Sequence, residues 1–209
     1  MATPPELAKR LARVRQLTDE YKAGDKRSFD AVRNLADFLL RLTVLKPSGG
    51  VRLASIQGPT KRFVAGGWNG PDDPLPLNDG KYLRLAITLE LVETKDGPRL
   101  KVFESSIQYQ ADRDGKDWIF RYDYLRYSPN PHPAAHLQIR GKLLRTGTRN
   151  IERIHFPTSR VSLEAIIRLL VQEFGVKCNE DSGVWRPVLA ESERLFFEIA
   201  HIPLSVFPV

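Results

Sequence analysis

The 209-residue chain has little cysteine and no long apolar run, and each shortage excludes a class of protein. Its single cysteine, Cys178, excludes an intramolecular disulfide and a metal site made of cysteines alone, which fits a reducing compartment. No apolar run approaches the roughly 20 residues that span a bilayer. The first residues, Met1 to Leu7, lack the basic and apolar regions of a signal peptide. We therefore expect a cytoplasmic protein with no membrane partner.

Common catalytic and nucleotide-binding motifs are absent as well. The glycine-rich segment 65–70 lacks the Gly-Lys-Ser/Thr ending of a P-loop, and no helical pattern follows it. Ser55, Ser105 and Ser106 lie in strand-like segments without the flanking glycines of a nucleophile elbow. Cys178 has no histidine near it in sequence, so a structural role is a better interpretation than a nucleophile. These absences predict no cofactor, and they leave open whether the chain is an enzyme.

The sequence has an excess of basic residues, and much of that excess lies in one segment. The formal net charge is +7 at pH 7. Residues 140–160 contain one acidic residue, Glu152. They contain six basic residues: Arg140, Lys142, Arg145, Arg149, Arg153 and Arg160. Clustered basic side chains attract phosphates by long-range steering and by counterion release. The segment therefore predicts a nucleic-acid contact, with a solvated basic hairpin as the alternative.

The N-terminal part predicts two amphipathic helices in a hairpin. Apolar residues recur at helical spacing over residues 7–21 and again after Ser28, a natural N-cap. The Lys-Pro-Ser-Gly-Gly sequence of residues 46–50 ends the second helix and marks a boundary. We expect a helical hairpin over residues 1–48 and an α+β core over residues 49–209, together forming one compact unit.

From residue 51 the apolar pattern changes to period two, which indicates strands. The clearest strand has leucine or isoleucine at every second position over residues 83–91. Turn sequences follow at residues 95–97 and 112–115, so strands over 99–110 and 118–124 complete an antiparallel meander. Shorter strands are predicted over residues 51–56, 62–64, 135–140 and 151–156.

Two helices and an apolar tail complete the chain. Ser162 is a natural N-cap for a helix over residues 163–174, which Gly175 ends. Pro187 suits the first turn of a last helix, and the tail from residue 201 is apolar but interrupted by prolines. We expect an α+β fold with an N-terminal helical hairpin and a mostly antiparallel β-meander of about five or more strands. Two C-terminal helices pack on this sheet.

Strand alternation places a group of charged side chains on one face of the predicted sheet. Side chains two positions apart point the same way, so the polar faces of three neighbouring strands can align. The residues brought together would be Arg121, Asp123, His136, Arg140, Arg153 and His155. Histidine can transfer a proton near neutral pH, and arginine can stabilise charge on a phosphate. These are the parts of a metal-independent phosphodiesterase, although an ordinary polar sheet face or a non-catalytic binding surface has the same pattern.

Three histidines also allow a metal site. His132 and His136 are four residues apart, but the prolines on both sides of His132 exclude a regular helix. In an extended chain these two residues lie about 13 Å apart, too far to share an ion. A turn at Pro133 would bring them together, with Asp123 or His155 as a further ligand for zinc. The metal site is the second interpretation of these histidines.

One segment carries a family resemblance. Phe120-Arg121-Tyr122-Asp123, followed by His132-Pro133 and Ala135-His136-Leu137, resembles the TumE-like toxins of bacterial toxin–antitoxin pairs. In that family a strand ending in arginine, an aromatic residue and aspartate leads into a histidine-bearing turn and a second histidine strand. His155-Phe156-Pro157 ahead of an amphipathic helix is similar to the family's carboxy-terminal part, so the resemblance covers about residues 82–175. Family members are typically smaller, and the N-terminal hairpin and the last helix would be additions.

The resemblance implies a cytoplasmic effector that acts on RNA and is held by a cognate antitoxin. We expect a toxin-like or defence-associated protein that engages nucleic acid as a metal-independent ribonuclease. In that hypothesis His136 and His155 are general acid and base, Arg121 and Arg140 are phosphate clamps, and Asp123 orients a histidine or an arginine. Phosphate contacts continue along Arg140, Lys142, Arg145, Arg149 and Arg153. The alternative is a non-catalytic module that binds a protein partner or forms a homo-oligomer.

Overall fold

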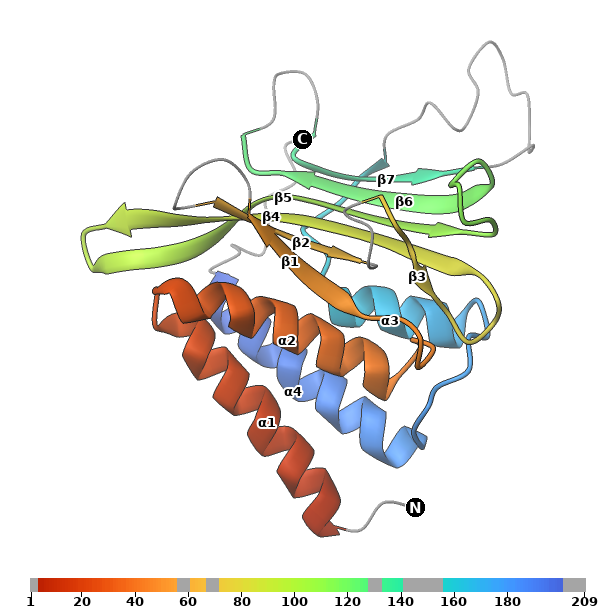
Figure 1. Cartoon of the computed structure of the whole chain (residues 1–209), viewed down its shortest axis with the longest axis horizontal. Helices are drawn as coiled ribbons and strands as arrows, with labels where there is room; N and C mark the ends of the chain where they lie inside the picture. The colour runs from red at the N-terminus through yellow and green to blue at the C-terminus, as the bar shows by residue number, and fades with distance from the viewer. Residues whose placement is uncertain (1–3, 56–60, 67–71, 128–132, 141–155, 201–209) are drawn as a thin grey trace.

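The computed structural model describes residues 4–55, 61–66, 72–127, 133–140 and 156–200 of the chain. In these residues, four helices lie on one side of an antiparallel sheet (Figure 1). The predicted α+β fold, with two helices before the strands and two after them, is confirmed. Among these helices, none is both long enough and apolar enough to cross a membrane.

The two N-terminal helices are α1 (Pro4–Lys22) and α2 (Lys26–Leu42). The N-cap of α2 is Asp25, whose carboxylate accepts the Arg27 N–H at 2.8 Å. Ser28 is not the cap, and that prediction is wrong by almost one helical turn. Its hydroxyl accepts the Asp25 N–H at 3.2 Å from inside the helix, which completes a capping box.

The sheet has the strand order β1-β2-β4-β5-β6-β7-β8, and β3 pairs with β4 beside this path. Every pairing between the described strands is antiparallel. The strands are β1 (Val51–Ser55), β2 (Lys61–Gly66), β3 (Leu75–Pro76), β4 (Tyr82–Thr94), β5 (Gly97–Gln110), β6 (Trp118–Leu125), β7 (Ala135–Ile139) and β8 (Phe156–Pro157). The predicted meander is β4, β5 and β6, and the two early strands join the same sheet. Of the strand predicted over residues 151–156, only Phe156 falls within the described residues.

The last two helices are α3 (Leu163–Gln172) and α4 (Ser182–Ala200). Ser162 is the N-cap of α3, as predicted, and its hydroxyl oxygen accepts the Ala165 N–H at 3.0 Å. The same hydroxyl donates to Glu193 of α4 at 2.7 Å. The cap of one helix therefore also joins it to the other.

The start of α4 differs from the prediction, because Pro187 lies inside the helix. The Asp181 carbonyl accepts the N–H groups of Val184 at 2.9 Å and Trp185 at 3.1 Å, so the first turn forms ahead of the proline. Val184 and Trp185 are both buried and hold this turn against the core. Pro187 follows as an interior residue that lacks one helix hydrogen bond.

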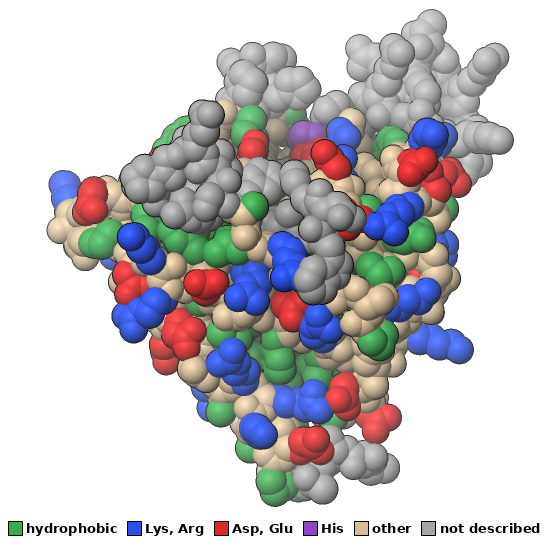
Figure 2. Space-filling model, viewed as in Figure 1, with side chains coloured by type: hydrophobic (Ala, Val, Ile, Leu, Met, Phe, Trp, Pro, Cys, Tyr) green, Lys and Arg blue, Asp and Glu red, His purple; other side chains and the backbone are tan. Residues whose placement is uncertain are grey.

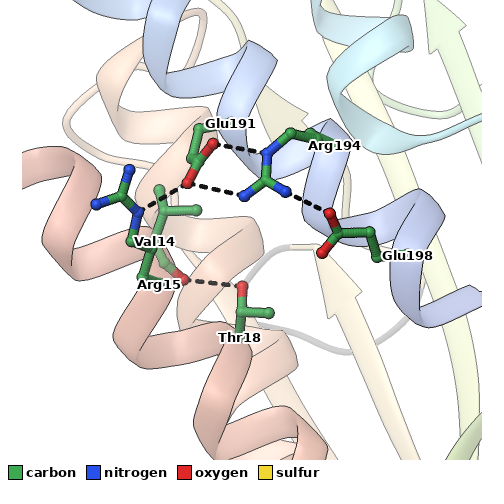
Figure 3. A network of polar contacts seen from close by, with 6 residues as sticks. All are labelled: Val14, Arg15, Thr18, Glu191, Arg194 and Glu198. Carbon is green, nitrogen blue, oxygen red and sulfur yellow. Dashed lines mark hydrogen bonds and ion pairs between the residues drawn. The ribbon is translucent and has the colours of Figure 1, made fainter.

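A network of ion pairs joins α1 to α4 (Figure 3). The Glu191 carboxylate accepts from Arg15 Nε at 2.7 Å and from Arg194 Nε at 3.0 Å. Arg194 also pairs with Glu198, one turn further along α4. Hydrogen bonds from Arg194 and Arg15 lower the pKa of Glu191 to about 2. Glu191 therefore links the two helices, because it pairs with an arginine from each of them.

The core lies between the helices and one face of the sheet. Alternate side chains of β4, β5 and β6 are buried there: Leu83, Leu85, Leu89, Ile107, Tyr109, Phe120 and Tyr122. Leu39 of α2 and Leu189 of α4 belong to the same cluster. The intervening side chains point to the opposite face of the sheet, which we call the outer face.

Candidate functional site

Three neighbouring strands bring polar side chains together on the outer face. In the register of β6 and β7, Asp123 lies opposite His136 and Arg121 lies opposite Gln138. On the other side of β6, Gln108 of β5 lies opposite Arg121. Side chains at these positions share a face because they are two residues apart along each strand. We name Arg121, Asp123, His136 and Gln138 the Asp123 cluster.

Asp123 lies at the centre of this cluster. Its Oδ2 accepts the Arg121 Nε–H at 2.8 Å and lies 3.6 Å from His136 Nε2. Arg121 Nη2 donates to Gln138 Oε1 at 2.5 Å. The guanidinium is therefore held by side chains from two strands. At 3.6 Å the Asp123 carboxylate can form an ion pair with a protonated His136, but the two side chains are outside hydrogen-bonding distance.

The members of the cluster differ in their access to solvent. The Arg121 side chain is 40% exposed, whereas the exposed fractions of Asp123 and His136 are 23% and 13%. A phosphate that reaches the outer face would meet Arg121 first. His136 is largely covered, and contact with it requires an approach past Arg121 and Asp123.

Arg140, which alternation also places on this face, is engaged at the turn between β5 and β6. Its Nη1 lies 3.1 Å from Asp117 Oδ1 and also donates to the Lys116 carbonyl. The side chain is therefore directed to the end of that hairpin, and Gln138 takes the position next to Arg121. Sequence reasoning assigned no role to Gln138, although its place in the same alternation was the available signal.

Several of the predicted site residues lie outside the described residues: His132, His155, Lys142, Arg145, Arg149 and Arg153. Their roles stay predictions. Within the described ranges, no group of three or more His, Cys, Asp or Glu side chains is arranged to hold a metal ion. The predicted zinc site includes His132, which lies outside the described residues, so it also stays a prediction.

The charge on the described surface is mixed. Figure 2 shows basic and acidic side chains interspersed over the visible face of the molecule. Some of the arginines are in ion pairs, for example Arg84 with Asp72 and Arg113 with Asp73. The most basic part of the chain, residues 141–155, lies outside the described residues. The clustering of basic residues in this segment is therefore a property of the sequence, and the structure does not describe where their side chains lie.

The environment of Cys178 agrees with a structural role. Burial raises the pKa of its thiol to about 11. A thiol with such a pKa is almost entirely protonated at neutral pH, and the thiolate is the nucleophilic form. Cys178 also contacts the hydrophobic core at its edge.

Comparisons of the chain with protein-family models, with curated proteins and with solved structures give no match. The resemblance to TumE-like toxins stays a prediction from a few motifs. What the protein does is therefore inferred from its own residues and their geometry.

Proposed function

We propose that the protein binds RNA on the outer face of β5, β6 and β7, with Arg121 contacting the phosphate backbone. The supporting observation is that Asp123 and Gln138 hold the Arg121 guanidinium while 40% of the side chain stays exposed. An arginine fixed by its neighbours loses little freedom on binding, and its planar fork suits two phosphate oxygens. The net charge of +7 adds long-range attraction for a polyanion.

The proposal extends to cleavage of the bound RNA. A general base removes the proton of a ribose 2′-hydroxyl, and the 2′-oxygen then bonds to phosphorus. The bond from phosphorus to the 5′-oxygen breaks, and a general acid protonates that oxygen. His136, beside Asp123, takes one of these roles, and His155 takes the other. Arg121 stabilises the charge that develops on the phosphoryl oxygens.

A toxin-like role is the biological setting of this proposal. A ribonuclease that attacks cellular RNA must be restrained, and a cognate antitoxin bound over the outer face would restrain it. The support for this part is the motif resemblance between residues 82 and 175.

Binding is tested with labelled single-stranded RNA at about 50 mM and about 200 mM salt. We expect weaker binding at the higher salt. Arg121→Ala lowers the affinity severalfold and reduces the slope of log affinity against log salt by about one. Arg33→Ala is the matched control, because Arg33 is also ion-paired and 34% exposed but lies on α2, on the other side of the sheet. No binding at low salt, or an equal loss in both variants, overturns the proposal.

Cleavage is tested separately with end-labelled RNA and purified protein. We expect His136→Ala to slow cleavage by about 10² to 10⁴, the usual contribution of a general acid or base, while RNA binding persists. Arg33→Ala serves again as the control and cleaves at the wild-type rate. Cleavage by His136→Ala at the wild-type rate would remove His136 from the mechanism, whereas the salt titration would still decide whether RNA binds.

A further inference from the structure

A cavity of about 160 Å³ lies between the helices and the sheet, on the opposite side of the sheet from the Asp123 cluster. It is bounded by α1, α2 and α4, by the inner faces of β4 and β5, and by the start of α3. Its walls are mostly apolar and include Leu17, Leu35, Leu39, Ile87, Ile107 and Phe196. Placing a strongly hydrated molecule against such walls costs free energy unless a polar group of the wall binds it.

One part of the cavity wall carries a positive charge. Arg160, just ahead of α3, has its guanidinium carbon 4.9 Å from the centre of the Tyr124 ring and 5.1 Å from that of Phe196. In the described part of the chain, no acidic side chain forms an ion pair with Arg160. Burial lowers the pKa of Arg160, and the positive charge of Arg126 acts in the same direction. The two rings attract the cation but do not neutralise it.

The carboxyl group in the cavity lining does not balance this charge. Glu164 is only 4% exposed, and its Oε1 accepts a hydrogen bond from the Ser192 hydroxyl. Burial raises the pKa of Glu164, so its environment favours the neutral form. The cavity therefore combines an apolar interior with a cation on its wall.

Size and charge together define what fits. For comparison, an engineered apolar cavity of about 150 Å³ in another protein holds benzene. A guanidinium presents parallel N–H groups that match the two oxygens of a carboxylate. The best occupant is thus a molecule about as large as benzene that carries a single carboxylate.

We propose that this cavity binds a small aromatic or branched aliphatic monocarboxylate, with its carboxylate on Arg160 and its apolar body between Leu39, Ile87 and Ile107. The ligand supplies the counter-ion that the described part of the chain does not offer to Arg160, and it fills the space between helices and sheet. This site is independent of the proposed RNA contact because the sheet lies between the two.

Benzoate is a suitable probe, with benzyl alcohol as the neutral molecule of similar shape. By calorimetry we expect benzoate to bind the full-length wild-type protein and benzyl alcohol to bind about tenfold more weakly or less. Arg160→Met, which keeps an unbranched apolar side chain, lowers benzoate affinity about tenfold or more, a typical loss for a charge-assisted pair. Arg168→Met is the matched control, because Arg168 is a nearby arginine that pairs with Glu193 and does not line the cavity.

Methyl NMR of the wild-type protein keeps the test decisive if Arg160→Met does not fold. Benzoate should shift the methyl resonances of Ile87 and Ile107 and leave those of Val176, a core residue outside the cavity lining, unchanged. Absence of benzoate binding, equal binding of benzyl alcohol, an equal loss in both variants, or unshifted isoleucine methyls each overturn the proposal.

Discussion

At the scale of single residues, two carboxyl groups show how burial and hydrogen-bond donors shift a pKa: Asp79, which is partly buried, and Glu164, which is buried. The Tyr109 hydroxyl donates to Asp79 Oδ2 at 2.6 Å, and Lys81 Nζ lies 2.9 Å from the same oxygen. Burial acts to raise the pKa of Asp79, but these two donors outweigh it and lower the pKa. For Glu164, burial is the largest effect and raises the pKa, while the hydrogen bond from the Ser192 hydroxyl lowers it by less. One carboxyl is therefore held charged, and the other is driven toward its neutral form.

The bond between Tyr109 and Asp79 predicts an alkaline dependence of stability. Tyr109→Phe should lower the free energy of unfolding at pH 7 by about 1 to 3 kcal/mol, because it removes a buried donor to a charged group. Burial, and then the bond to Asp79, raise the pKa of Tyr109 from 10.0 to about 12. The stability contributed by the neutral phenol is complete below pH 10 and is lost as the pH rises toward 12.

Urea unfolding of wild-type protein and Tyr109→Phe at pH 7 and pH 11 measures this effect. The difference between the two proteins should shrink at the higher pH. Tyr127→Phe, at a side chain that is mostly exposed, is the control and should show little change at either pH. A difference that is the same at both values would contradict the assigned pKa direction.

Glu164→Gln predicts a pH dependence of stability in the same direction but at lower pH. Because the folded-state pKa of Glu164 is raised above 4.5, the stability of its neutral form is complete below pH 4.5 and is lost as the pH rises. Glutamine stays neutral and can still accept from Ser192, so the variant should gain stability relative to wild type between pH 4 and pH 8. Thermal unfolding at both values measures this, with exposed Glu173→Gln as control. A constant difference between wild type and Glu164→Gln would show that Glu164 titrates normally.

At the scale of elements, α4 is held to α1 through Glu191, and this predicts an acid-sensitive contact (Figure 3). The pKa of Glu191 is lowered to about 2, so its contribution is present above pH 4.5 and is lost as the pH falls toward 2. Glu191→Gln should lower the free energy of unfolding at pH 7 by about 1 kcal/mol, since Arg15 and Arg194 are largely exposed and solvent screens them.

The measurement is chemical unfolding of wild type and Glu191→Gln at pH 7 and near pH 2.5, where the two proteins should converge. Glu198→Gln is the matched control, because Glu198 contacts Arg194 from the same helix and does not reach α1. It should cost less than Glu191→Gln. An equal loss in both variants would mean that the bridge to α1 adds nothing.

Helices and strands could be predicted from the sequence where the pattern of neighbouring residues alone decides them. The end of a helix could not be predicted where two residues can each take the capping position. The period-two pattern and the turns predicted β4, β5 and β6 because alternation and tight turns are properties of neighbouring residues. At α2 both Asp25 and Ser28 are good caps, and only the folded turn shows that aspartate takes that position. At α4 the proline suggested a first turn, but the buried Val184 and Trp185 extend the helix ahead of it.

At the scale of the whole molecule, the two faces of the sheet differ in how far the sequence could predict them. Asp123 and His136 could be placed on the same face because alternation decides the face of each side chain, whereas the register that sets them directly opposite each other is known only from the structure. The direction of Arg140 could not, since its partner Asp117 comes from a turn whose shape the strand pattern does not define. The cavity could not be predicted either, because residues from several helices and strands form its walls together. The sequence around a single lining residue such as Leu39 is that of an ordinary core position.

Two contacts join the end of α1 and the turn after it to the sheet. The Tyr21 hydroxyl at the end of α1 donates to the Leu100 carbonyl of β5 at 2.9 Å. In the following turn Gly24 has φ 67°, and a Cβ atom there would lie 2.0 Å from the Pro98 carbonyl oxygen. The turn between α1 and α2 is thus in direct contact with the β4–β5 hairpin. We expect the helices and the sheet to unfold together in one transition.

Gly24→Ala tests this coupling, because it forces the turn away from Pro98 and strains a left-handed backbone. We expect a loss of about 1 to 3 kcal/mol in the free energy of unfolding. Hydrogen exchange followed by mass spectrometry should show the same loss of protection in peptides from α2 and from β4, since both open in the same global event. Gly183→Ala is the control, as an added Cβ there meets nothing within 4 Å. Loss confined to the helical peptides would instead mean that residues 4–42 open as a separate unit while the sheet stays folded.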